Sequence, residues 1–228
     1  MSTQQRTVVL LSLVSLLSFA SPAYAGRFGA HGARGAIGGV NRTVNGPNGG
    51  MAQRAALNGW RPGAGGFHAS GSQGTTGNGG AWRRGGATAW KNGEGMAHGS
   101  AFSGTTANGG SLDRQGQMHY QNGVGGSASR GFNAATASGA SASGYKTNNY
   151  DAATGQGTST KGRDINTASG ESYGYDASTS YTKGQGFTTS VDTQNKGDYT
   201  VDYSKGSKPV VTPVPAPAPI STSVAPAQ

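Results

Sequence analysis

Apolar and polar residues alternate along several stretches of the chain, as they do in β-strands that present two different faces. Over residues 111–121, Leu112 and Tyr120 fall on one side of an extended backbone, and positions 113, 115, 117, 119 and 121 are all polar. Over residues 172–181, the odd-numbered positions read Tyr, Tyr, Ala, Thr and Tyr. This period of two predicts strands of about ten residues.

The strand-like stretches recur with a period of about 30 residues. Glycines at positions 49, 63, 79, 93, 109, 123 and 139 are separated by alternating steps of 14 and 16 residues. Asn-Gly pairs, which favour tight hairpin turns, coincide with five of these glycines. A Thr-Thr-x-Asn-Gly signature occurs at 75–79 and again at 105–109. When the repeats are aligned, one column is aromatic: Trp60, Trp90, Tyr120, Tyr150 and Tyr181.

These patterns predict an all-β protein: an extended array of about five 30-residue β-hairpin repeats over residues 43–206, as a meander or a solenoid, with flexible termini. In either arrangement the aromatic column should occupy one face. The alternative is a largely disordered chain, because glycine is abundant (42 residues) and residues 26–228 contain only 19 Leu, Ile, Val and Phe. That scarcity argues against a globule with a closed hydrophobic core.

The first 25 residues have the features of a secretory signal peptide. Arg6 precedes an apolar stretch at 7–20, and Ala23-Tyr24-Ala25 supplies a small-x-small cleavage motif, which predicts Gly26 as the mature N-terminus. The alternative, an uncleaved anchor, needs about 20 apolar residues. We expect a secreted protein, whether periplasmic, cell-surface or extracellular, with no membrane span after cleavage.

The segments flanking the repeats differ from them in composition. Residues 26–42 form a Gly/Arg-rich leader that we expect to be flexible, and residues 207–228 form a Pro/Ala-rich tail. The chain has no cysteine, which excludes disulfides. No GxSxG or HExxH motif occurs, and the four histidines lack metal-site spacing. We therefore expect neither an enzyme nor a metal site, and no cofactor.

Positive charge is concentrated near the N-terminus. Residues 26–93 contain eight Lys and Arg, no Asp or Glu, and all three tryptophans. Guanidinium groups can contact phosphates or sulfates, and indoles can stack on bases or sugars. The expected partners are extracellular DNA, acidic polysaccharide or lipopolysaccharide; the alternative is that these charges only keep the chain in solution. The candidate polyanion-binding residues are Arg54, Arg61, Arg83, Arg84, Lys91, Trp60, Trp82 and Trp90.

The glycine-rich repeats and Asn-Gly turns resemble glycine-rich, repetitive secreted proteins of bacterial surfaces and biofilm matrices. Tyr-Asp-Ala at 150–152 and 175–177 is similar to the YD hairpin repeats of RHS-type proteins. The resemblance implies a non-enzymatic structural or adhesive role, with self-association. The alternatives are a disordered secreted filler, an amyloid-type subunit or an antimicrobial peptide precursor.

Overall fold

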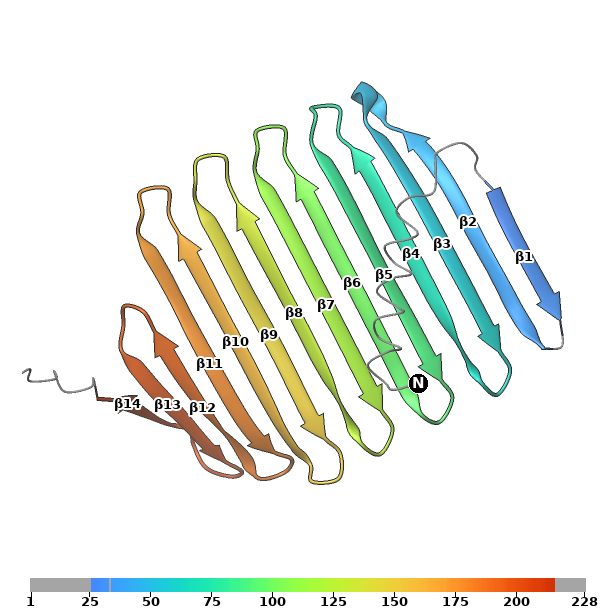
Figure 1. Ribbon diagram of the computed structural model, residues 1–228. Helices are drawn as coiled ribbons and strands as arrows, with labels where there is room; N and C mark the ends of the chain where they lie inside the picture. Colours follow the sequence, from blue (N-terminus) through green and yellow to red (C-terminus); the bar gives the residue numbers. More distant parts are fainter. Residues whose placement is uncertain (1–25, 33, 216–228) are drawn as a thin grey trace, which may run out of the picture.

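The computed structural model describes residues 26–32 and 34–215. The predicted signal peptide and residues 216–228 of the predicted tail lie outside the described residues. Fourteen antiparallel strands form one sheet, and their order in the sheet follows their order in the chain (Figure 1). The prediction of an all-β hairpin array is confirmed, and of its two arrangements the structure is the meander.

The first seven strands are β1 (Gly26–Gly32), β2 (Gly35–Asn45), β3 (Met51–Arg61), β4 (Gly65–Thr75), β5 (Ala81–Lys91), β6 (Gly95–Thr105) and β7 (Ser111–Gln121). The others are β8 (Gly125–Ala135), β9 (Ser141–Asp151), β10 (Gln156–Asn166), β11 (Ser172–Thr182), β12 (Gly186–Thr193), β13 (Asp198–Ser204) and β14 (Val210–Val214). A short 3-10 helix, η2 (Pro47–Gly49), lies between β2 and β3.

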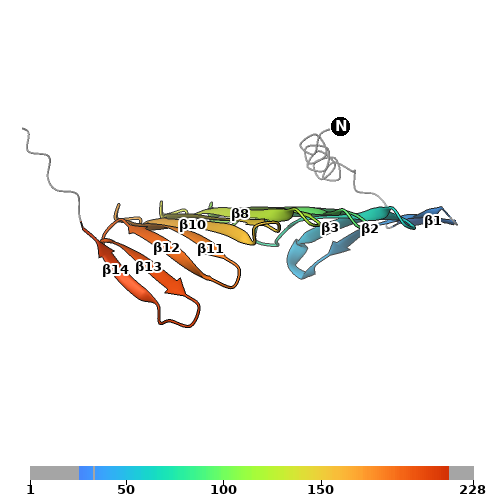
Figure 2. The same ribbon diagram turned by 90° about the horizontal axis from the view of Figure 1, so that it is seen from below.

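The sheet is a single layer, and its last strands bend away from the plane of the others (Figure 2). It extends beyond the predicted repeat region at both ends. Within the segment 26–42, expected to be a flexible leader, residues 26–32 instead form β1 and residues 35–42 form most of β2, and β14 lies within the predicted tail. Strand pairing uses backbone groups, so a glycine-rich segment poor in apolar side chains can still extend a sheet.

Two kinds of turn alternate along the two ends of the strands. Between β3 and β4, the Ala64 amide donates to the Arg61 carbonyl (3.1 Å), and Gly63 has a φ of +73°, as a type II turn requires. At the opposite end, after β4, the Thr76 hydroxyl accepts a hydrogen bond from the Gly80 amide (3.0 Å). The same hydroxyl contact recurs at Thr106, Thr136 and Thr167. The repeated threonine signature therefore fixes this turn.

The turn between β9 and β10 is one residue longer than the equivalent turns between β3 and β4, β5 and β6, and β7 and β8. The Asp151 carboxylate stabilises it by accepting hydrogen bonds from the amides of Ala153 (2.8 Å) and Thr154 (3.1 Å). The extra residue is absorbed there, so Tyr150 and Tyr181 stay in one row across Gly157.

The sheet has almost no core. Among the described residues the buried apolar side chains are Ala69, Ala87 and Ala177. Aromatic rings instead cover glycines: a Cβ added to Gly66 would lie 2.6 Å from the Trp90 ring, and one added to Gly59 would lie 2.6 Å from the Phe67 ring. Glycine leaves space for a ring to lie along the backbone, and such pairs stabilise a sheet in the absence of a second layer.

Residues paired in register share a face, so the pairing defines two faces. Face A carries the even-numbered positions of β2 to β9 and the odd-numbered positions of β1 and β10 to β14; face B carries the others. The aromatic column predicted from the sequence lies on face A in one row. Within it the rings of Tyr150 and Tyr181 are stacked, with centroids 6.5 Å apart. The prediction of a common face is confirmed.

Candidate functional site

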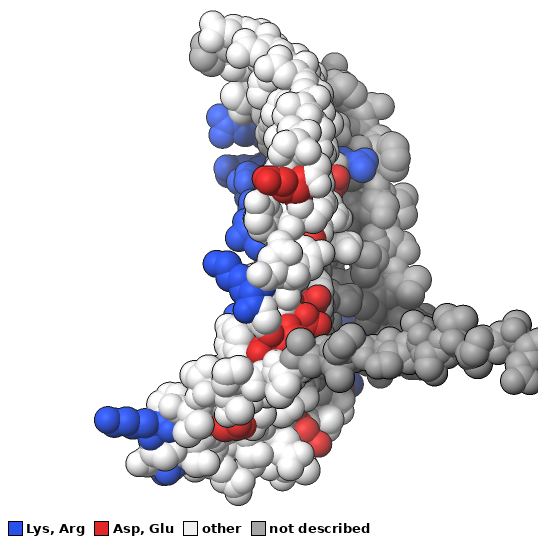
Figure 3. All heavy atoms as spheres, turned by 90° about the vertical axis from the view of Figure 1, so that its left-hand side faces the viewer, with Lys and Arg blue, Asp and Glu red and all other residues white. Residues whose placement is uncertain are grey.

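Charge is divided between the two faces of the sheet. The described strands place no Asp or Glu on face A, whereas seven aspartates lie on face B. The cations of face A are Arg27, Arg42, Arg54, Arg84, Arg114, Arg130, Lys146, Lys161 and Arg163. The aspartates of face B are Asp113, Asp151, Asp164, Asp176, Asp192, Asp198 and Asp202, beside Arg61, Arg83 and Lys91. Viewed along the sheet, most of the visible Lys and Arg side chains project from one side (Figure 3).

The central part of face A consists of two adjacent rows of residues that run across the strands. Row 1 consists of Arg54, Ser72, Arg84, Phe102, Arg114, Phe132, Gly144, Arg163 and Tyr175, and charge and ring alternate from Arg84 to Phe132. Row 2 contains Gly116, Arg130, Lys146, Lys161 and Ala177. Together the two rows line an open depression of about 1040 Å³.

Three cations of row 2 are direct cross-strand neighbours. Arg130 pairs with Lys146, and Lys146 pairs with Lys161. Cβ atoms of such pairs lie about 5 Å apart, and like charges at that distance destabilise a sheet. Among the described residues the ion pair present is Lys91–Glu94, away from these rows. An anion bound over row 2 would relieve this repulsion.

Cations and aromatic rings of face A are also in contact with each other. The guanidinium carbon of Arg84 lies 5.7 Å from the centre of the Trp82 ring, and that of Arg163 lies 5.9 Å from the Phe132 ring. The Lys161 ammonium lies 5.8 Å from the Tyr175 ring. Arg84 is further fixed because its Nε donates a hydrogen bond to the Ser72 hydroxyl (2.8 Å). These contacts restrain long side chains that would otherwise be mobile.

The phenylalanine rings of row 1 lie along the sheet and do not stand away from it. A Cβ added to Gly144 would lie 2.6 Å from Cε1 of Phe132, so this ring occupies the space above the glycine. Phe102 lies in the same way toward Gly104, where an added Cβ would be 3.0 Å from Cζ. Both phenylalanine side chains are half-buried on this face.

The residues selected from the sequence are divided between the two faces. Arg54 and Arg84 lie in row 1, Trp82 lies next to it, and Trp60 and Trp90 belong to the aromatic row on the same face. Arg61, Arg83 and Lys91 lie on face B, away from these residues.

Sequence reasoning missed the cations that continue the two rows: Arg114, Arg130, Lys146, Lys161 and Arg163. Net charge along the chain does not distinguish them, because acids of the other face lie beside or between them in the sequence. The signal was present in pairs such as Asp113-Arg114 and Arg163-Asp164, whose opposite charges occupy consecutive residues of one strand.

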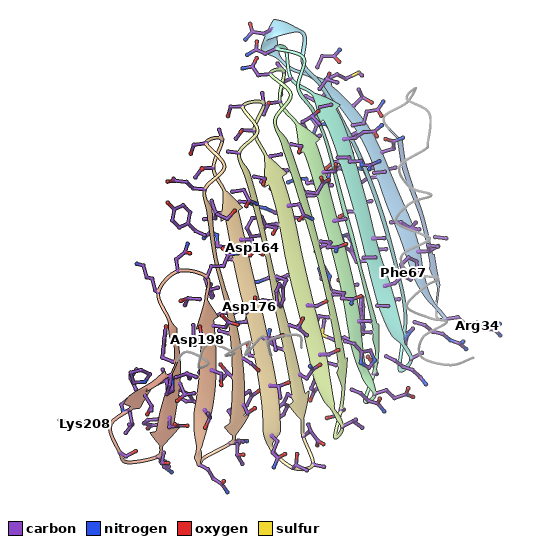
Figure 4. All side chains as sticks on the ribbon, turned by 60° about the vertical axis from the view of Figure 1, so that its left-hand side comes forward. Arg34, Phe67, Asp164, Asp176, Asp198 and Lys208 are labelled. Atoms are coloured by element: carbon purple, nitrogen blue, oxygen red, sulfur yellow. The ribbon has the colours of Figure 1, made fainter. Side chains whose placement is uncertain are left out.

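The acidic residues of face B interact among themselves and with Tyr145. The Tyr145 hydroxyl donates to the Asp176 carboxylate (2.6 Å), and this hydrogen bond raises the pKa of the phenol. The charge of Asp198 raises the pKa of Asp192. Figure 4 labels Asp164, Asp176 and Asp198 on β10, β11 and β13. These acids lie on the face opposite to the two cationic rows.

In the described part of the chain, no three His, Cys, Asp or Glu side chains come together in a group that could hold a metal ion. No helix among the described residues is long and apolar enough to cross a membrane. Comparisons of the chain with protein-family models, with curated proteins and with solved structures gave no match.

Proposed function

We propose that this protein is an exported, non-enzymatic structural or adhesive protein that binds polyanions through face A of its sheet. The observation that supports the proposal is the division of charge, with nine cations and no acid on the described strands of face A. A chain in which Lys and Arg only maintained solubility would need no such division, because its net charge would be the same with the signs mixed.

The geometry suits a long ligand better than a small one. Row 1 runs across the strands from β3 to β11 and row 2 from β7 to β11, and the depression they line is open. Eight strand spacings of about 4.8 Å give a surface about 38 Å long. A linear polyanion can follow such a surface and release counterions at each cation that it contacts.

Two triple variants with the same loss of charge test the proposal. Arg114→Gln/Arg130→Gln/Lys146→Gln removes three cations from face A, and Arg61→Gln/Arg83→Gln/Lys91→Gln removes three from face B. For a single-stranded polyanion, the first variant should lower the slope of log K against log salt by about 2. The second should change it little. Equal losses in both variants would mean that only net charge matters and would refute the role of face A.

Self-association is a second candidate function, favoured by the opposite charges of the two faces. Face A of one copy is complementary to face B of another, and such a contact between unlike surfaces can propagate into an open stack. Sedimentation velocity tests this candidate. A stack held by these charges should dissociate as salt is raised, and a protein that stays monomeric at low salt would contradict it.

A further inference from the structure

We infer that the polyanion bound by face A is a single-stranded nucleic acid. The inference rests on the proposed function and adds the class of ligand. The evidence for this class is in row 1, where the four consecutive strands β5 to β8 present Arg84, Phe102, Arg114 and Phe132 in register. Charge and ring thus alternate in one line across the sheet.

This alternation matches the chemistry of a single strand. Each nucleotide supplies one phosphate charge and one planar base, and proteins that bind such strands combine a positively charged track with aromatic stacking. On face A, like groups in row 1 recur every two strands, about 9.6 Å apart. Further along, Arg130, Lys146 and Lys161 of row 2 continue the charge beside Phe132 and Tyr175 of row 1.

The rings are placed where bases can stack on them. Phe132 reaches over Gly144 and Phe102 reaches toward Gly104, and both side chains are half-buried, so part of each ring is supported by the sheet and part remains accessible. The guanidinium carbon of Arg163 lies over the Phe132 ring, 5.9 Å from its centre, so a base that reaches this ring also meets a cation. Phenylalanine has no polar group, so these rings contribute stacking and no hydrogen bond to a sugar hydroxyl.

Other polyanions would leave part of this surface unused. In a duplex the bases are paired and stacked inside, so an exposed phenylalanine has no base to contact. An acidic polysaccharide offers charges to the arginines, but its many hydroxyl groups would find no hydrogen-bond partner on Phe102 or Phe132. A single strand uses both kinds of side chain.

The test compares two phenylalanine variants that are alike except for their face. Phe132→Leu removes a ring that lies over Gly144 on face A, and Phe67→Leu removes a ring that lies over Gly59 on face B. Fluorescence anisotropy is measured with labelled oligothymidylate and oligouridylate of about 16 nucleotides, the upper end of known site sizes. A DNA duplex and polygalacturonate compete with the labelled strand.

The unaltered protein should bind both single strands equally and more tightly than it binds the duplex or polygalacturonate, because stacking and phosphate contacts do not detect the sugar 2′-hydroxyl. Phe132→Leu should weaken single-strand binding about 5- to 150-fold, the value of one stacked base, and leave polygalacturonate binding unchanged. Phe67→Leu should alter neither.

Two outcomes would overturn the inference, and they are distinguishable. If polygalacturonate or the duplex binds as tightly as the single strands and Phe132→Leu has no effect, the ligand class is wrong while the polyanion function stands. If none of the four probes binds at low salt, both are wrong. Circular dichroism of both variants shows whether either substitution unfolds the sheet.

Discussion

Arg83 and Arg84 are consecutive in the chain but lie on opposite faces of β5. Arg84 pairs with Ser72 and Phe102 in row 1, and Arg83 pairs with Gln73 and Ser103 on face B. Both side chains are exposed. The two arginines therefore provide a matched pair, in which the same substitution alters one face at a time.

Charge reversal at this pair should separate the two faces. Arg84→Glu should weaken polyanion binding at low salt about 5-fold, corresponding to about 1 kcal/mol, because it removes one contact and adds repulsion. Arg83→Glu changes the net charge equally and should have a much smaller effect. Isothermal titration at two salt concentrations measures the polyanion affinity of both variants. A larger loss of affinity for Arg83→Glu would contradict the assignment of face A.

Neutralising the middle cation of row 2 should stabilise the fold while weakening binding. Lys146 has a cation directly opposite it on each side, Arg130 and Lys161. Lys146→Gln should raise the free energy of unfolding by about 0.5 kcal/mol at low salt, and the gain should shrink as salt screens the charges. Urea denaturation at low and high salt measures this change in the free energy of unfolding. Lys205→Gln, in the turn before β14, is the control and should change stability little.

The glycine beneath Phe132 should be intolerant of a side chain. Gly144→Ala forces the ring to move and should destabilise the sheet by about 1–3 kcal/mol. Gly99→Ala is the matched control, since an added Cβ there meets nothing within 4 Å. Because alanine restricts the unfolded chain, Gly99→Ala should stabilise by about 0.4–1 kcal/mol. Equal effects of the two variants in urea would refute the ring-over-glycine packing.

The acidic pair on face B predicts a pH dependence of stability. Repulsion from Asp198 raises the pKa of Asp192 in the folded sheet above its ordinary value of 3.8. A raised folded-state pKa gives stability that is fully present below the unfolded pKa and is lost as pH rises through the folded pKa. Asp192→Asn should therefore raise Tm at about pH 7, and the difference should vanish near pH 3. Asp113→Asn, whose cross-strand neighbours are Ser103 and Asn133, should change Tm little.

The predicted export can be tested by identifying the N-terminal residue of the mature protein. The cleavage motif that ends at Ala25 predicts Gly26 as the first residue of the mature protein, and β1 begins at that residue. N-terminal sequencing of protein recovered from outside the cytoplasm should begin Gly-Arg-Phe. A sequence that begins at Met1 in a membrane fraction would favour the uncleaved anchor.

The strands, the turns and the aromatic column could be predicted because each depends on local spacing. Asn-Gly pairs mark where strands end, and the 30-residue spacing of the aromatic column predicts that its members share a face. The strands of residues 26–42 could not be predicted in this way. They contain few alternating apolar positions, and they are held by backbone pairing to β3, which no side-chain pattern records.

The residues of face A were only partly predictable from the sequence. Of the candidates selected from the sequence, Trp60, Trp90 and Arg84 lie on face A, whereas Arg61 and Lys91 end their strands on face B. The face on which a side chain lies depends on whether its residue number is odd or even within its strand. The face can be assigned only when the strand boundaries are known. One additional turn residue, such as the one before β10, moves the odd-numbered positions of the following strands to the other face.

The 30-residue period has an evolutionary consequence. Each strand pairs only with its neighbours in the chain, so duplication of one repeat inserts a hairpin without disturbing the others. Because 30 is an even number, the duplicated Lys and Arg keep their face. Unequal recombination between repeats would therefore lengthen the cationic surface in steps of about 9.6 Å, one hairpin at a time. Under the proposed function, the number of repeats would set the length of polyanion that the surface contacts, and this number can change without a new fold.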